Sequence, residues 1–582
     1  MNTGSSLKFS SLPHGKSDNL EVTEGYTATT LIRWGDPLFP GMAVFDPNTL
    51  TAEEQKKRFG YNNDYIAYMP LEGSSSHGLL CVNQEYSIAR LMFPEALLKN
   101  YGAALGRIEM AAHGHSVLEI RKEAGRWRVV QESRHTRFLN GLDTVFILTG
   151  PAAGHARMQT SADPSGTKVI GTYSNCAGGK TPWGTVLFCE ENVDLYFSGT
   201  TSDEVEKGNH DRLGIKKKGR YRWAEFDKRF RIDEEPREPN RFGWVVEYDP
   251  YDPQSTPKKR TALGRLKHES ATPVACPDGR IAIYSGDDQK NEYLYRFVTA
   301  KRWNPQDRAA NADLLDEGTL SAARFEEDGT LRWLPLVFGH GPLTPENGFH
   351  SQADVLIETR RAADLLGATP MDRPEDIEAH PTTGHVFVSL THNETKTKAN
   401  KANPRTPNPH GHILELIPPS ADHAAEVFRW EIFLLAGDPF DAASGARYAE
   451  GIARNDYFSS PDNLAFDPQG RLWVATDGMD EMLGVNDGVY AMETSGAARA
   501  LPRHFLNVPL GAEATGPEFT PDGTTFFLSV QHPGDNKGSF FDAPSTRWPD
   551  FDPSLPPRPS VIAVTREDGG KSGNRMLAAH TA

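Results

Sequence analysis

The chain has 582 residues, 38% of them hydrophobic, and a formal net charge of −16 at pH 7. This acidity argues against nucleic acid as a partner, because contacts to phosphates need patches of lysine and arginine. No segment approaches the roughly 18 consecutive apolar residues of a membrane span. The first residues also lack the apolar core of a secretory signal. We therefore expect a large globular protein without nucleic-acid or membrane partners.

The N-terminal part of the chain predicts strands around one helical segment. Apolar runs at 29–36 and 78–86 favour an early strand pair, and residues 89–102 favour a short helix. Alternating residues at 115–131 predict two strands joined by a turn at Gly125. The 52 Gly and 42 Pro of the chain fit many turns between short strands.

Two polar stretches interrupt the pattern further along. Residues 200–238 mix acids and bases, which predicts a solvated surface insertion rather than a basic recognition patch. A second polar insertion lies near 393–412. The apolar strand at 560–566 is expected to pair with the first strands of the chain. We expect three parts: an N-terminal extension at 1–25, a single domain at 26–567 and a flexible C-terminal tail at 568–582.

Four stretches of the chain repeat one pattern, beginning at His268, Arg373, Ser459 and Thr515. Each has an acid near its start, then a Pro-containing turn closed by a glycine, then an alternating apolar strand. The four acids are Glu269, Glu375, Asp462 and Glu518. Sheet units that recur around an axis indicate an all-β fold of the β-propeller type. A closed propeller has no free sheet edges, so we expect a monomer.

The repeat also predicts a metal site. Acids at equivalent points of successive blades would converge on the central channel. Carboxylates share a small space only if cations neutralise them, since unpaired like charges repel and raise one another's pKa. Each of these acids taken alone could simply cap a turn. The metal hypothesis therefore depends on their recurrence at the same point of the repeat.

The cysteines differ in their surroundings. Cys81, Cys189 and Cys276 lie in apolar, strand-like runs and are expected to be buried structural thiols. Cys176 lies in the polar, glycine-rich stretch SNCAGGKTPWGT. Four cysteines are too few for a disulfide framework in a chain of this length.

Several motifs together carry a resemblance to a known family. They include RWGDPLFPG at Arg33, GLLCVNQEY at Gly78, NCAGGKTPWGT, NRFGWVVEYDP, GRLKHES at Gly264, RPEDIE, SSPDNLAFD and GPEFTPDG, in order along nearly the whole chain. In these the sequence resembles the PhoX-type alkaline phosphatases. The resemblance implies a six-bladed propeller catalytic domain, Fe(3+) and Ca(2+) in its channel, and hydrolysis of small-molecule phosphomonoesters. It also implies a periplasmic or secreted enzyme, although this chain shows no export signal.

The resemblance assigns roles to individual residues. It makes Cys176 an iron ligand and Glu269 and Glu375 metal carboxylates. It makes Arg373 the catalytic arginine that grips the substrate phosphate, because a planar guanidinium binds two phosphoryl oxygens at once. The further acids expected at the metals are Glu85, Glu190, Glu191, Asp462, Glu378 and Glu518. Without the resemblance, Arg373 could equally be an ion-pair partner between blades.

One stretch departs from the family pattern. The family has an asparagine ahead of a threonine that helps to hold phosphate, whereas here Asp143 precedes Thr144 and Asn140 lies nearby. An aspartate repels phosphate unless it is protonated or paired with a cation. We keep Asn140 and Asp143 as candidate substrate-binding residues.

The chemistry of the candidate ligands agrees with iron and calcium. Calcium takes about six to eight oxygen ligands in irregular geometry, and carboxylates supply them. One thiolate among hard oxygens suits ferric iron. Zinc is less suitable, because its structural sites use closely spaced Cys and His pairs that this chain lacks.

Two other readings remain open at this point. A calcium-dependent propeller lactonase or phosphotriesterase would share the fold and the channel metal, but would leave the thiolate of Cys176 unexplained. A non-enzymatic propeller that uses calcium for structure would not need Arg373 in the channel. Metal content measured beside phosphatase and lactonase activity would separate the three.

Overall fold

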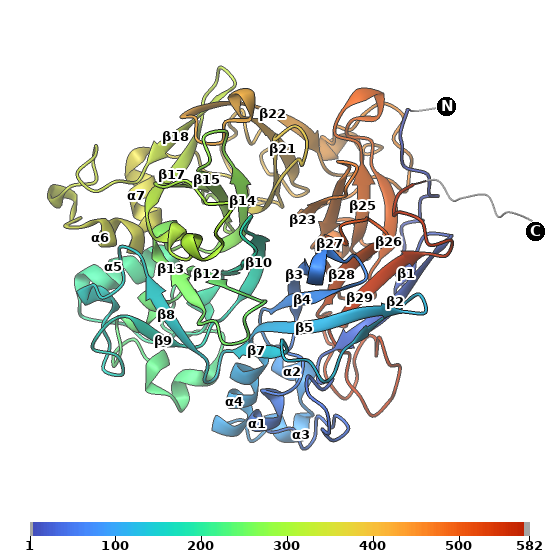
Figure 1. Cartoon of the computed structure of the whole chain (residues 1–582), viewed down its shortest axis with the longest axis horizontal. Coiled ribbons are helices and arrows are strands. Elements are labelled where there is room, and N and C mark those ends of the chain that lie inside the picture. The colour runs from blue at the N-terminus through green and yellow to red at the C-terminus, as the bar shows by residue number, and fades with distance from the viewer. Residues whose placement is uncertain (1–3, 575–582) are drawn as a thin grey trace, which may run out of the picture.

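The computed structural model describes residues 4–574 and shows sheets arranged around a central channel (Figure 1). Within these residues, six innermost strands each contact the next around the ring, in the order β3, β10, β14, β19, β23 and β27, and β27 contacts β3 again. Each innermost strand begins a sheet that runs outward, with antiparallel pairs except between β13 and β8, which pair in parallel. The predicted all-β, six-bladed propeller is confirmed.

The innermost strands follow one another in chain order, and within each blade the strands lie, from the inside outward, as follows. Blade 1 contains β3 (Asn63–Pro70), β4 (His77–Gln84), β5 (Gly114–Glu123), β6 (Arg126–Val129) and β7 (Arg137–Asn140). Blade 2 contains β10 (Asn175–Lys180), β11 (Val186–Glu190), β12 (Val245–Tyr248), β13 (Lys258–Arg260), β8 (Val145–Thr149) and β9 (Lys168–Ile170). Blade 3 contains β14 (His268–Ala275), β15 (Ile281–Asp287), β16 (Leu294–Thr299), β17 (Gly318–Phe325) and β18 (Thr330–Pro335).

The second half of the ring follows the same plan. Blade 4 contains β19 (Pro374–Ala379), β20 (Val386–Leu390), β21 (His412–Ile417) and β22 (Val427–Leu435), and β22 pairs with β18 of blade 3. Blade 5 contains β23 (Pro461–Phe466), β24 (Leu472–Thr476), β25 (Gly488–Met492), β26 (Arg503–Asn507) and β1 (Glu21–Val22). Blade 6 contains β27 (Glu513–Phe519), β28 (Thr525–Gln531), β29 (Ser560–Arg566) and β2 (Tyr26–Arg33).

The two ends of the chain close the ring. The last strand, β29, pairs antiparallel with β2, from Tyr26 opposite Arg566 to Arg33 opposite Ser560. The pairing of the final apolar strand with an early strand is therefore confirmed, but β2 is the outermost strand of blade 6 and not part of blade 1. The expected flexible tail extends from residue 568, and residues 575–582 of it lie outside the described residues.

Short helices cover the periphery of the propeller (Figure 1). They are α1 (Ala52–Gln55), α2 (Ala89–Met92), α3 (Glu95–Leu98), α4 (Ala103–Ala112), α5 (Glu204–Leu213), α6 (Gln352–Ile357), α7 (Thr359–Leu366) and α8 (Met479–Leu483). The helical segment predicted at 89–102 becomes α2 and α3, because Pro94 starts a new helix. Across residues 4–574, every helix is too short or too polar to cross a bilayer.

The core lies between and within the blades. Cys81, Cys189 and Cys276 are buried among apolar side chains of three different core clusters, as the sequence predicted. The charged insertion at 200–238 is also anchored there, since Trp223 and Phe230 belong to the same cluster as Cys81. This anchoring fixes the insertion against the blades.

Candidate active site

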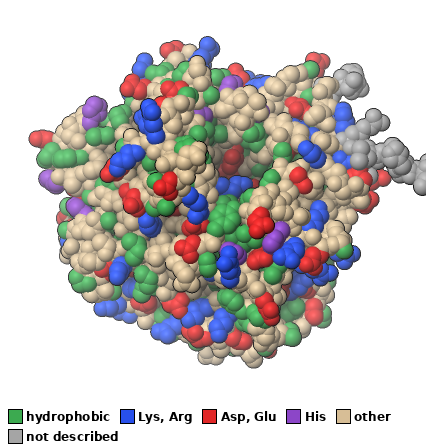
Figure 2. Space-filling view, in the orientation of Figure 1, with side chains coloured by type: hydrophobic (Ala, Val, Ile, Leu, Met, Phe, Trp, Pro, Cys, Tyr) green, Lys and Arg blue, Asp and Glu red, His purple; other side chains and the backbone are tan. Residues whose placement is uncertain are grey.

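A pocket of about 280 Å³ lies where the innermost strands meet, and it is strongly acidic. Figure 2 shows acidic side chains inside the hollow near the centre of the face. Eight carboxylates line the pocket: Glu85, Glu191, Glu269, Asp288, Glu375, Asp462, Asp477 and Glu513. The thiol of Cys176 and the guanidinium groups of Arg220 and Arg373 also line it.

Strand pairing explains why so many acids arrive at one place. In each blade the innermost strand starts where the second strand ends, because the two are antiparallel. In blade 1, Asn63 pairs with Gln84, and the next residue of each, Asp64 and Glu85, belongs to the site. The same offset gives the pairs Cys176 and Glu191, Glu269 and Asp288, and Asp462 and Asp477. One geometric rule therefore supplies most of the cluster.

Irregular backbone marks the same positions. Every innermost strand shifts register within a few residues of its start, as a β-bulge does when it redirects side chains. Four non-glycine residues have positive φ angles and stand two positions before Asp64, Cys176, Glu375 and Asp462. They are Asn62, Ser174, Arg373 and Ser460, with φ angles of 48°, 52°, 55° and 52°. Left-handed backbone at a non-glycine residue costs about 1–3 kcal/mol and is retained chiefly at functional sites. The strain is thus concentrated at this end of the channel.

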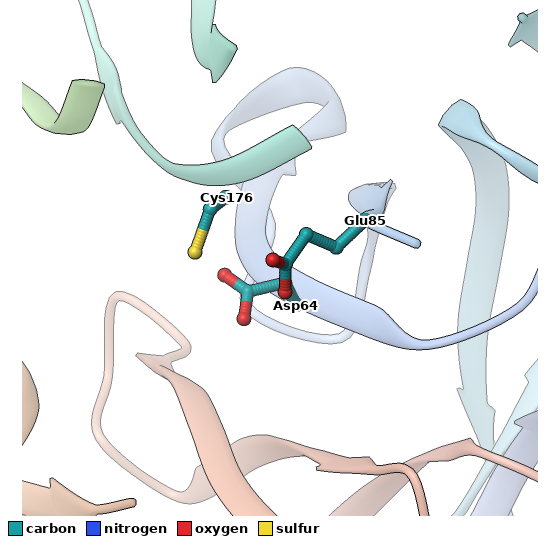
Figure 3. Close-up of side chains that lie close together, drawn as sticks. All are labelled: Asp64, Glu85 and Cys176. Carbon is teal, nitrogen blue, oxygen red and sulfur yellow. The ribbon is translucent and has the colours of Figure 1, made fainter. Parts of the chain in front are cut away.

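The ligating atoms lie close enough to share ions. Three triplets each have their atoms within 4.8 Å of one another, and they overlap at Cys176 and Glu269. The triplets are Asp64, Glu85 and Cys176; Cys176, Glu191 and Glu269; and Glu269, Glu375 and Asp462. Figure 3 shows the first, with the sulfur of Cys176 and both carboxylates pointing into one space. A further triplet joins Asp477, Glu513 and His532.

The protein alone does not neutralise this cluster. Burial, followed by repulsion from Asp64, raises the pKa of Glu85 to about 8. Burial and the neighbouring carboxylates likewise raise the pKa values of Glu191, Glu269 and Asp462. Burial and the charge of Asp64 also raise the pKa of the Cys176 thiol. Bound cations reverse such shifts, since a metal stabilises the deprotonated form of each ligand.

Arg373 is a cation held firmly among these acids. Its Nε and a terminal nitrogen donate to the two oxygens of Asp288 at 2.8 and 2.6 Å, and the same terminal nitrogen lies 2.7 Å from Glu375. Burial on its own would raise the pKa of Asp288, but the Arg373 guanidinium lowers it below its ordinary value. Asp288 therefore fixes the direction in which Arg373 points.

The structure brings together seven of the residues that the sequence singled out. Arg373, Cys176, Glu85, Glu191, Glu269, Glu375 and Asp462 all line the central pocket. Glu190 does not, although it precedes Glu191. Successive residues of a strand face opposite sides, and Glu190 points into blade 2, where its carboxylate accepts from buried Lys259 at 2.6 Å. We therefore leave Glu190 out of the cluster.

Glu378 and Glu518 lie at the opposite mouth of the channel, in a second pocket of about 330 Å³. They stand three to five residues further along their strands than Glu375 and Glu513. At about 3.3 Å per residue, this places them roughly 10–16 Å away along the channel. Glu518 pairs with Lys180 there and accepts the backbone N–H of Tyr68. Both acids are outside the proposed cluster.

Asn140 and Asp143 are also distant from the pocket. They flank the turn after β7, which pairs with β5 in the outer part of blade 1. The Asn140 amide donates to Asp143 at 3.0 Å, and Asp143 forms an exposed ion pair with Lys56. These contacts stabilise a local turn. Because Asp143 lies away from the pocket, its negative charge does not repel a phosphate bound there.

Sequence reasoning missed three members of the site, Asp64, Glu513 and Arg220, and it left open whether Asp288, Asp477 and His532 are turn residues or ligands. A signal for some of them exists. In the four repeats the acid that reaches the pocket stands eight to ten residues before the turn glycine, which selects Glu513 and not Glu518 before Gly523. Asp288 and Asp477 directly follow the second strands of their blades. Only the pairing of those strands with the innermost strands shows that these two acids reach the pocket.

Comparison with known proteins agrees with this geometry. The sequence profile of the family described as Alkaline phosphatase PhoX matches residues 7–534. The solved structure of Pseudomonas fluorescens PhoX in complex with vanadate, a transition-state analogue, is 39% identical, with a TM-score of 0.92 over 98% of this chain and 100% of that one. Curated protein sequences give no match.

Other solved structures are far less similar. A Dyadobacter fermentans protein of unknown function is 8% identical, with a TM-score of 0.37 over 93% of this chain and 99% of that one. The Pseudomonas aeruginosa periplasmic gluconolactonase PpgL is 9% identical, with a TM-score of 0.31 over 86% and 88% of the two chains. Neither likeness carries an argument about function. The profile match and the Pseudomonas fluorescens structure show that this chain belongs to the PhoX family of alkaline phosphatases.

Proposed function

We propose that this phosphatase hydrolyses phosphomonoesters in the central pocket, with iron and calcium ions held by Cys176 and the surrounding acids. Membership of the PhoX family makes the chain a metal-dependent alkaline phosphatase. The observation that carries the assignment of the metals is the overlap of the triplets at Cys176, which places one soft ligand among hard ones.

The residues present fit these ions. A buried thiol beside Asp64, Glu85, Glu191 and Glu269 offers ferric iron one thiolate and several carboxylate oxygens. Acid groups without a thiol, such as Glu375 with Asp462 or Asp477 with Glu513, offer the oxygen ligands that calcium prefers. When bound, the ions supply positive charge for the phosphoryl oxygens and activate the attacking oxygen.

Arg373 has the geometry of a phosphoryl-binding residue. Asp288 holds its guanidinium at the pocket wall by two hydrogen bonds, and within residues 4–574 its other terminal nitrogen forms no hydrogen bond or ion pair. A planar guanidinium aimed at the equatorial oxygens stabilises the charge that spreads over them in phosphoryl transfer. The complex of Pseudomonas fluorescens PhoX with vanadate, a transition-state analogue, supports phosphoryl transfer as the reaction of this chain.

We also propose that the enzyme acts outside the cytoplasm, in the periplasm or after secretion. The support is the family, whose members are in general periplasmic or secreted. Fractionation of cells that express the full-length gene would test this, since activity confined to the cytoplasm would contradict it.

Elemental analysis of the purified protein beside a phosphomonoesterase assay tests the proposal. Iron and calcium together with turnover support it, and calcium alone with lactone turnover would favour the lactonase reading. Removal of the metals by a strong chelator should abolish activity and lower the unfolding temperature together, because the acids then face one another without counter-ions. Full activity of verified metal-free protein would contradict metal dependence.

A further inference from the structure

Arg220 is a guanidinium of the pocket wall to which the phosphatase reaction above gives no task. It comes from the charged insertion at 200–238 and lies over the ring of Tyr86, 4.9 Å from its centroid, and near Tyr221 at 5.9 Å. Within residues 4–574 no carboxylate lies at ion-pair distance from its guanidinium. It therefore differs from Arg373, whose charge Asp288 and Glu375 neutralise.

A second cavity, of about 430 Å³, adjoins the central pocket at Arg220. Arg220 lines both cavities. The chain segment after β4 also passes from one to the other, because Glu85 and Tyr86 line the central pocket while Ser87 and Ile88 line the second cavity. A phosphoryl group in the central pocket would thus have its leaving group directed past Arg220 into this side cavity.

The side cavity suits an anionic group better than the acidic pocket does. Its other arginines are already neutralised, since Arg90 pairs with Asp535 and Arg222 binds Glu225 through two hydrogen bonds. The carboxylates that line the cavity are also engaged, because Asp535 pairs with Arg90 and buried Glu109 accepts hydrogen bonds from the hydroxyls of Ser87 and Tyr101. Among the described residues of this wall, Arg220 is thus an arginine without a carboxylate at ion-pair distance. An unpaired guanidinium is a strong donor for carboxylate or phosphate oxygens.

Contacts to the blades hold Arg220 in place without a carboxylate. Its backbone N–H donates to the carbonyl of Leu195 at 2.8 Å. The hydroxyl of Tyr221 donates to the carbonyl of Ser87 at 3.0 Å and accepts from its N–H at 3.1 Å. The ring of Tyr221 stacks on Tyr196 with centroids 4.6 Å apart. These contacts fix the backbone at Arg220, while its side chain is exposed and its guanidinium lies over the ring of Tyr86, where a ligand can reach it.

We propose that Arg220 recognises an anionic group on the leaving group, so that the enzyme selects phosphomonoesters whose alcohol carries a carboxylate or a second phosphate. This inference rests on the proposed phosphatase function of the central pocket. It makes the charged insertion a determinant of substrate choice and not merely a surface feature.

The test compares two substrates of similar size, 3-phosphoglycerate and glycerol 3-phosphate, which differ in a carboxylate on the leaving group. The ratio of their kcat/KM values should fall about 10-fold in Arg220→Gln, the effect of losing one charge-assisted hydrogen bond. Arg220→Lys should keep most of the ratio. Lys218→Gln removes one exposed charge from the same insertion and serves as the matched control.

The outcomes separate the two hypotheses. If the wild type hydrolyses neither substrate, the proposed function fails. If Arg220→Gln lowers both kcat/KM values equally, the guanidinium contacts the phosphoryl group or supports the fold, and leaving-group recognition is wrong. A ratio unchanged by Arg220→Gln, or lowered as much by Lys218→Gln, would also overturn the proposal.

Discussion

The two mouths of the propeller channel are built by the same six strands but differ in how their acids are satisfied. At one mouth, acids from neighbouring blades face one another and the thiol of Cys176. At the opposite mouth the protein supplies partners to two of the acids: Glu518 pairs with Lys180, and Asp376 accepts the backbone N–H groups of Leu464 and Ile377 at 2.9 and 2.8 Å. Glu378 lies beside them, and burial with the charge of Asp376 raises its pKa. Acidity alone therefore does not distinguish a metal site from a structural cluster.

The backbone draws the same distinction. The left-handed residues Asn62, Ser174, Arg373 and Ser460 all precede site residues at the first mouth. The opposite mouth is formed by the turns that follow the innermost strands, with Pro381, Pro468 and Pro521 in its wall. Ala177, with a φ of 46°, also lines the second pocket, but it directly follows Cys176, so this strain too lies beside a site residue.

Replacing Arg373 should have the largest effect on catalysis. Arg373→Ala should lower kcat/KM for a phosphomonoester by about 100- to 1,000-fold, because a preorganised donor to the transition state is lost. Arg373→Lys should recover only part of this, since an ammonium cannot bind two oxygens in parallel. Steady-state kinetics on metal-replete protein give the measurement, and near-wild-type turnover of Arg373→Ala would contradict the assignment.

Metal-free protein should lose stability as the pH rises. The pKa of Glu85 is raised from 4.5 to about 8 in the folded chain, so folding favours its protonated form. That stabilisation is present below the unfolded pKa and is lost between about pH 4.5 and 8, with a change on the order of 5 kcal/mol.

Denaturant unfolding of the metal-free and the metal-bound protein at several pH values measures this effect. The metal-bound protein should show little of the loss, because ions compensate the deprotonated acids. Glu85→Gln should flatten the pH dependence of the metal-free form. Equal pH profiles for both forms of the wild type would contradict the cation-filled cluster.

The smallest effect is expected at the opposite mouth. Glu378→Gln removes an acid that the sequence placed at the metals and the structure places in the second pocket. Its kcat/KM and metal content should stay within about two-fold of the wild type, since surface-like substitutions away from a site change little. Loss of a metal ion from Glu378→Gln would erase the distinction between the two mouths.

Much of the fold could be predicted because the repeat is regular. The acid, the turn glycine and the alternating strand recur in four blades, and the apolar strand at 560–566 indicates closure. The blade to which β2 belongs could not be predicted. The sequence of an early strand has the same alternating pattern whether it starts the first blade or completes the last one. That choice depends on pairing across more than 500 residues.

The site was predictable only where the strand itself carries the signal. Glu269, Glu375 and Asp462 stand at one point of the repeat, whereas Asp64 and Asp288 need the register between strands to be recognised. Glu190 and Glu191 are adjacent acids, and only the pleat decides which one faces the channel. Arg220 lies in a mixed-charge segment, where no local pattern reveals that its guanidinium reaches the pocket.

The visible absorption spectrum of Cys176→Ser, recorded beside its iron content and activity, tests the central claim most directly. A thiolate bound to ferric iron absorbs visible light by charge transfer, so the wild-type protein should be coloured. Cys176→Ser should lose the colour and most of the activity, while Cys189→Ser, altered in the core, should keep the colour. A Cys176→Ser protein with an unchanged spectrum, iron content and turnover would show that this cysteine is not a metal ligand.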